Sequence, residues 1–166
     1  MKSEKFFYHK RRSFQAGFSL VEISLVGAIL FILMGLVTVN LFKFQHKSQL
    51  SATVQTFLAD YKEQQIKAMV GDTEGTTSVA AYGIHLETTS YTLFRNTYGT
   101  GNFTINLPGG TKFVTTFPSS QVIFATGSGE ISGFTNGSNT ITVQDSGDGS
   151  QKVITIDRYG VVTSVN

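Results

Sequence analysis

The chain has 166 residues, which suits one domain with an additional segment. Its net charge of +2 is unevenly distributed, because the first 17 residues carry five basic side chains and one acidic one, and the remainder is negative. This distribution gives no support for nucleic-acid binding. The absence of cysteine excludes a disulfide-stabilised domain and a cysteine nucleophile.

The basic N-terminal segment ends at Gly17 and is followed by a long apolar run. The 25 residues from 18 to 42 contain no Lys or Arg, and Glu22 is their one charged side chain. A run of this length predicts a membrane-spanning helix, and the positive-inside rule places the basic segment in the cytoplasm. A carboxylate within such a run is energetically costly and therefore indicates a function.

Two simpler interpretations of the N-terminus explain fewer of its residues. An ordinary cleaved signal peptide has an apolar region of about 7–15 residues and a small-residue cleavage site, whereas this run is longer and lacks an Ala-x-Ala pattern. A plain single-pass anchor fits the length of the run. It leaves Gly17, Phe18 and Glu22 unexplained.

The N-terminus contains, in order, Gly17, Phe18, Ser19, two aliphatic residues and Glu22, followed by fourteen apolar or small residues. This pattern resembles the class III signal of type IV pilins and type II secretion pseudopilins. The resemblance implies that a prepilin peptidase cleaves the leader of residues 1–17 after Gly17. It also implies N-methylation of the new N-terminus at Phe18. Glu22 would then act in assembly by pairing with the N-terminal amine of a neighbouring subunit in the filament core.

Residues 18 to about 70 are expected to form one long helix, in which residues 18–42 form the transmembrane and assembly part. Residues 43–71 read as its amphipathic continuation. Leu50, Val54, Phe57 or Leu58, and Tyr61 recur there at spacings of three and four residues, which is typical of a helix packed on one side. Gly71 is expected to end the helix.

Residues 72–166 are expected to form an antiparallel β-sheet domain that buries one face on the second half of the helix, which gives an α+β fold. Thr, Ser, Gly and Asn dominate this region, and short alternating runs lie between turn residues. Residues 145–150 and 157–160 are expected to form the last two hairpin turns. The alternating runs predict about eight strands, at residues 82–86, 91–94, 103–107, 112–117, 121–125, 140–144, 152–157 and 161–165.

A second resemblance concerns this sheet region. The predicted strands begin directly after the long helix, they form many hairpins, and the region lacks cysteine. In these features the region is similar to the H-type minor pseudopilins and the related FimT-like minor pilins. The segments at residues 82–86, 91–94 and 154–162 carry this similarity. It implies that the chain is a minor subunit.

Two acidic residues near the C-terminus, Asp145 and Asp148, allow two interpretations. The resemblance to major pseudopilins, which bind calcium in a C-terminal loop, makes a calcium site one of them. The segment from residue 145 to 150 lacks the spaced oxygens and the distal Glu of an EF-hand loop. A simple hairpin turn is the other interpretation and the one that we favour.

The sequence gives no indication of an enzyme or of a cofactor. His9, His46 and His85 are scattered, and none has ligand spacing to another His or to an acid. The sheet region has four basic residues, too few for a DNA-binding surface. Most of its aromatic side chains are expected in the core: Phe94, Tyr98, Phe103, Phe113, Phe117, Phe124, Phe134 and Tyr159.

The sequence therefore predicts a structural, minor subunit of a type II secretion pseudopilus or a type IV pilus. The subunit would cross the inner membrane once, with its sheet domain in the periplasm or outside the cell. Its expected partners are prepilin peptidase, other pilin or pseudopilin subunits and membrane lipid. A membrane-anchored binding or adhesion module that does not polymerise is the alternative. Secretion, motility and DNA uptake share this N-terminal pattern, so the pattern does not separate them.

Overall fold

A computed structural model describes residues 17–99 and 102–166, with the backbone alone at residues 37–43. The expected leader, residues 1–17, therefore lies outside the described residues except for Gly17. The chain divides into two units, Met1–Asn40 and Leu41–Asn166. The second unit contains the end of one long helix and two antiparallel sheets, so the predicted α+β class is confirmed.

The long helix, α1 (Leu20–Val70), begins two residues later than expected and ends where predicted. Gly71 adopts the left-handed conformation, with φ 65°. Its N–H donates to the carbonyl of Ala68 at 3.3 Å, and the N–H of Asp72 donates to the carbonyl of Lys67 at 2.9 Å. These two bonds form a Schellman motif, which favours glycine because a Cβ is strained at positive φ. The predicted helix stop at Gly71 is confirmed.

All eight predicted strand regions are strands in the described chain, and their bounds differ from the predicted ones by at most two residues. Two four-stranded antiparallel sheets result, with strand orders β3-β2-β1-β5 and β4-β6-β7-β8. A short 3₁₀ helix, η1 (Pro118–Ser120), precedes β5 and was not predicted. The strands are β1 (Tyr82–Leu86), β2 (Ser90–Arg95), β3 (Phe103–Asn106), β4 (Thr111–Thr115), β5 (Gln121–Phe124), β6 (Thr140–Asp145), β7 (Gln151–Ile156) and β8 (Val162–Val165).

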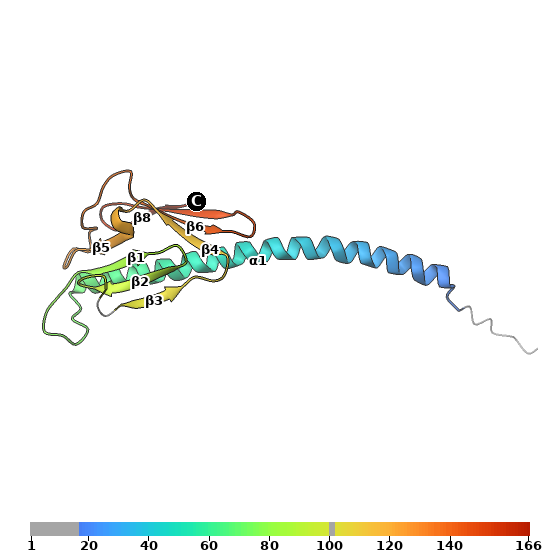
Figure 1. Cartoon of the computed structure of the whole chain (residues 1–166), viewed down its shortest axis with the longest axis horizontal. Coiled ribbons are helices and arrows are strands. Elements are labelled where there is room, and N and C mark those ends of the chain that lie inside the picture. Colours follow the sequence, from blue (N-terminus) through green and yellow to red (C-terminus); the bar gives the residue numbers. More distant parts are fainter. Residues whose placement is uncertain (1–16, 100–101) are drawn as a thin grey trace, which may run out of the picture. The chain divides into compact units, whose positions relative to one another are not determined.

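The second half of α1 lies against both sheets (Figure 1). The predicted stripe is buried, and Phe57 rather than Leu58 is the buried residue at the position where the sequence allowed either. The ring of Phe57 lies 5.3 Å from that of Tyr91 in β2 and 5.1 Å from that of Phe113 in β4. One helical side chain thus contacts an aromatic ring from each sheet. This aromatic cluster joins the helix and the two sheets into one core.

Polar side chains on the same helix bind the turns at the end of the sheets. The hydroxyl of Tyr61 donates to the carbonyl of Gly160 at 3.2 Å. The side-chain amide of Gln65 donates to the carbonyls of Gly129 at 3.1 Å and Tyr159 at 2.9 Å. These bonds satisfy buried backbone carbonyls, which would otherwise cost free energy. Burial and the nearby charge of Asp157 raise the pKa of Tyr61, so its hydroxyl stays a donor at neutral pH.

The expectation that most aromatic side chains of the sheet region are in the core holds for Phe94, Phe113, Phe117 and Phe124, which are buried. It is wrong for Phe103 and Tyr159, which are exposed. Tyr98 and Phe134 are half-buried. Phe103 is 67% exposed because β3 is an edge strand. Tyr159 is exposed because it lies in the turn between β7 and β8.

Replacing Phe57 by Ala should lower the free energy of unfolding by about 3–5 kcal/mol, since it empties the centre of the aromatic cluster. The matched control is Phe44→Ala on the same helix, where the ring is 70% exposed. The control should change stability by no more than about 0.5 kcal/mol. Denaturant unfolding followed by tyrosine fluorescence measures both, because the chain has no Trp. Equal losses from the two variants would contradict the packing of the helix on the sheets.

Candidate functional site

Ser19 and Glu22 form a reciprocal cap at the start of α1. The backbone N–H of Glu22 donates to the hydroxyl of Ser19 at 3.2 Å, and the N–H of Ser19 donates to the carboxylate of Glu22 at 3.3 Å. This is a capping box, which satisfies two backbone donors that the helix itself leaves unpaired. The negative charge of Glu22 in the first turn is also favourable to the helix dipole. The Ser-x-x-Glu spacing in the sequence is the signal for this cap, which is a role of Glu22 in addition to the one expected in assembly.

Gly17 and Phe18 directly precede this cap in a non-helical, exposed segment. A Cβ added at position 17 would meet no atom within 4 Å. Folding of the described chain therefore places no demand for glycine at this position.

The first turns of α1 expose many large apolar side chains. Between Leu20 and Leu36 these side chains are 49% to 84% exposed, and they occur on all faces of the helix. In the part of the chain that the structure describes, no helix has both the length and the hydropathy that crossing a membrane requires.

His46 contacts an acidic side chain that lies far away in the sequence. Its Nδ1 lies 3.1 Å from Oδ2 of Asp145, a side chain 99 residues further along that is only 3% exposed. No local pattern predicts this pair, because α1 and the end of β6 meet only in the folded unit. His85 stacks on Tyr98 with ring centroids 4.0 Å apart. His9 lies outside the described residues.

Asp145 and Asp148 serve the turn between β6 and β7, and the predicted hairpin is confirmed. The N–H of Gly147 donates to Asp145 at 2.6 Å, and the N–H of Ser150 donates to Asp148 at 2.9 Å. The bond from Gly147 and the contact with His46 lower the pKa of Asp145, and the bonds from Ser150 lower the pKa of Asp148. Within the described ranges, no three side chains of His, Cys, Asp or Glu gather as metal ligands would.

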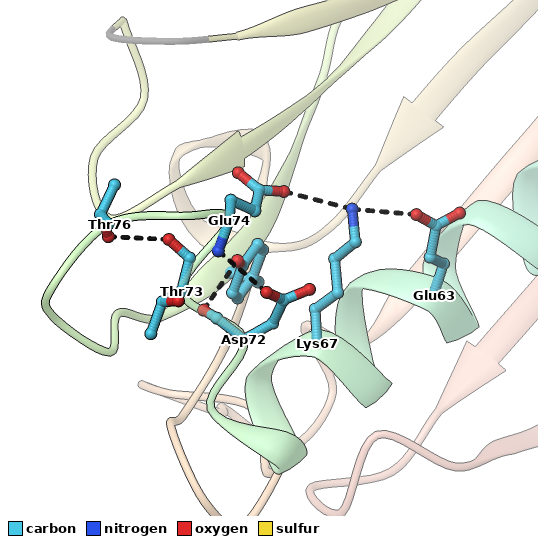
Figure 2. Close-up of polar contacts among 7 residues, drawn as sticks. Glu63, Lys67, Asp72, Thr73, Glu74 and Thr76 are labelled. Atoms are coloured by element: carbon cyan, nitrogen blue, oxygen red, sulfur yellow. Dashed lines mark hydrogen bonds and ion pairs between the residues drawn. The ribbon is translucent and has the colours of Figure 1, made fainter.

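A second polar cluster, which the sequence analysis missed, fixes the loop after α1 (Figure 2). Nζ of Lys67 lies 2.9 Å from Glu63 on the same helix and 3.2 Å from Glu74 in the loop. Partial burial lowers the pKa of Lys67, but the hydrogen bonds and charges of the two glutamates outweigh it, and the pKa is raised overall. The hydroxyl of Tyr82 donates to the carbonyl of Asp72 at 2.9 Å and holds the beginning of the loop.

Comparisons with protein-family models, with curated proteins and with solved structures find no match for this chain.

Asp145 should contribute to stability in a pH-dependent way. Its pKa in the folded chain lies below the ordinary aspartate value of 3.8, so its contribution is complete above that pH. The contribution is lost as the pH falls through the lowered pKa. The difference in free energy of unfolding between the wild type and Asp145→Asn should therefore be largest at neutral pH and shrink in acid.

Urea unfolding at pH 7 and at pH 3 measures this difference. The control is Asp148→Asn, which removes an exposed carboxylate from the same turn and should have the smaller effect at both values. A stability difference for Asp145→Asn that does not depend on pH would contradict the role given to its charge.

Proposed function

We propose that the chain is a structural, minor subunit of a filament of the type IV pilin class, in either a type II secretion pseudopilus or a type IV pilus. The observation that carries the proposal is the order Gly17, Phe18, Ser19, Glu22 at the start of a helix whose first turns are apolar on all sides. The antiparallel sheets that follow α1 agree with the resemblance to the H-type and FimT-like minor subunits.

Processing accounts for the glycine at position 17. The described chain makes no contact that a Cβ at this position would disturb, so the reason for glycine lies outside its own packing. A peptidase that draws the backbone into its active site supplies such a reason, because a side chain next to the scissile bond would obstruct the approach. Cleavage there leaves Phe18 as the N-terminus, whose amine is then methylated.

A hydrophobic environment accounts for the exposed apolar side chains. Apolar side chains on all faces of a helix are typical of a helix that is surrounded by apolar partners. We assign residues 18–42 to a single crossing of the inner membrane, with the sheet domain in the periplasm or outside the cell. During assembly, lipid contacts would be replaced by contacts with the helices of neighbouring subunits.

Glu22 has two functions in this proposal. In a single subunit its carboxylate accepts a hydrogen bond from the N–H of Ser19, which satisfies part of its hydrogen-bonding capacity. The charge itself has no cationic partner among the contacts described for it. In the low-dielectric core of a filament an unpaired charge is costly, and the methylated amine of a neighbouring Phe18 is the available cation. Pairing with it would set the axial register of the subunits.

Mature protein should begin at Phe18, and Gly17→Val should remain full-length in the membrane. The matched control is Ala16→Val, which introduces the same side chain one residue earlier and should still be cleaved. N-terminal sequencing and intact mass distinguish the products. A native chain that begins at Met1 would contradict the proposal and favour the non-polymerising adhesion module.

A set of variants separates the capping role of Glu22 from its charge. Glu22→Gln keeps an acceptor for the N–H of Ser19 but removes the charge, while Ser19→Ala removes the cap and keeps the charge. Loss of an N-cap costs about 1 kcal/mol, which a helix of 51 residues tolerates. We expect Glu22→Gln and Glu22→Leu to be inserted and processed but not incorporated into filaments. Ser19→Ala should be incorporated, and Glu22→Asp should be incorporated in part.

Cross-linking of processed subunits to the other filament components measures incorporation. Equal incorporation of Glu22→Gln and the wild type would contradict the charge pairing. Equal failure of Ser19→Ala and Glu22→Leu would assign Glu22 to the cap alone.

A further inference from the structure

Two turns of the sheet domain contain a dipeptide that is prone to a chemical change. An asparagine followed by glycine is labile, because glycine has no side chain to keep its backbone nitrogen away from the asparagine amide. The sequence contains one such pair, Asn136 and Gly137, and one related pair, Asp148 and Gly149. The first pair lies in the turn before β6, and the second lies in the turn between β6 and β7. The hydrogen bonds of the two turns differ.

The turn at Asn136 leaves both reacting groups free. It is exposed, and the N–H of Ser138 closes it by donating to the carbonyl of Thr135 at 3.1 Å. Gly137 has a φ of 86°, which fits the third position of a type II turn. The N–H at that position takes no part in the bond that closes the turn. In the part of the chain that the structure describes, neither this N–H nor the side chain of Asn136 has a hydrogen-bond partner.

The residues on either side of this turn are fixed to the core. Phe134 packs against the buried apolar cluster. The side-chain amide of Asn139 donates to the carbonyl of Ile156 at 2.7 Å, and the N–H of Ile156 donates to the carbonyl of Asn139 at 3.1 Å. The turn between these two anchors can therefore change its conformation and its covalent structure while the strands stay in place.

The turn at Asp148 holds the corresponding groups in hydrogen bonds. The N–H of Gly149 donates to the carbonyl of Asp145 at 3.1 Å. The carboxylate of Asp148 accepts a hydrogen bond from the N–H of Ser150 at 2.9 Å. Attack of the Gly149 nitrogen on this side chain would require these bonds to open first, which costs free energy. The folded chain therefore protects this pair and leaves the pair at Asn136 unprotected.

We propose that Asn136 is a site of spontaneous deamidation in the folded chain. The backbone nitrogen of Gly137 loses its proton to hydroxide and attacks Cγ of Asn136, and ammonia leaves, which closes a succinimide ring. Water then opens the ring at one of its two carbonyl carbons. Addition at Cγ gives aspartate, and addition at the former backbone carbonyl gives isoaspartate, in which the main chain runs through Cβ and Cγ.

The net reaction consumes one water, releases one ammonia and adds one negative charge to the exposed turn. It needs neither an enzyme nor a partner subunit, so the modification is independent of the proposed function. The anchors at Phe134 and Asn139 lie outside the reacting pair. We therefore expect the modified chain to keep its fold.

The test incubates the full chain in detergent for several days at pH 7 and at pH 9. Mass spectrometry of proteolytic peptides locates the change in mass, and labelling with an isoaspartyl methyltransferase detects isoaspartate. Both products should accumulate at Asn136, and faster at pH 9, because the attacking nitrogen must lose its proton. The rate at Asn136 should be similar in buffer and in urea, since the fold does not protect this turn.

The matched variant is Asp148→Asn, which places the same dipeptide in the turn where the N–H of Gly149 is bonded. In the folded variant, position 136 should react about tenfold faster than position 148, the factor expected for opening one hydrogen bond. In urea the two rates should become similar. Thermal unfolding verifies that the variant is folded during the incubation.

Three outcomes would overturn the proposal. The first is the absence of product at Asn136 at both pH values. The second is an equal rate at positions 136 and 148 in the folded variant. The third is a wild-type rate at Asn136 that rises steeply in urea, which would mean that the folded turn is protected; this measurement does not depend on the folding of any variant.

Discussion

Burial of one stripe of α1 against two separate sheets is the contact on which the rest of the domain depends. Each sheet has four strands, and neither closes on itself. Phe57 contacts a ring from each of them, and Leu50, Val54 and Tyr61 extend the same buried stripe. A fully buried side chain of this kind contributes about 1.5–3 kcal/mol. Because the chain has no disulfide, these contacts carry the stability of the domain.

The polar groups on the same helix determine how the helix and the sheets are aligned. Apolar contacts alone would tolerate a shift of the helix along its axis, since they have no directional preference. Such a shift would break the hydrogen bonds that Tyr61 and Gln65 donate. Their acceptors are the carbonyls of Gly160, Gly129 and Tyr159. The pair of His46 and Asp145 adds a further contact, closer to the start of the domain's helical segment. Together they fix one register for the helix in an otherwise apolar contact.

The polar groups at the start of α1 have a different consequence. Ser19 and Glu22 complete the hydrogen bonds of the first turn, so the helix begins at a defined residue just after Phe18. A helix that begins there leaves Gly17 and Phe18, the proposed cleavage site, outside the helix. The same carboxylate is the group that the proposed pairing between subunits uses. Local capping and the proposed assembly role are therefore compatible in one side chain.

The sequence by itself determined the elements of this protein. Apolar spacing located the buried stripe of α1, Gly71 located its end, and alternation between turn residues located all eight strands, because each of these signals acts over a few residues. Tertiary structure alone decided that His46 meets Asp145, which lies 99 residues further along the chain. It also decided that Phe103 is exposed, because β3 is the edge strand of its sheet. Patterns over a few residues encode neither the pairing of distant side chains nor the position of a strand in its sheet.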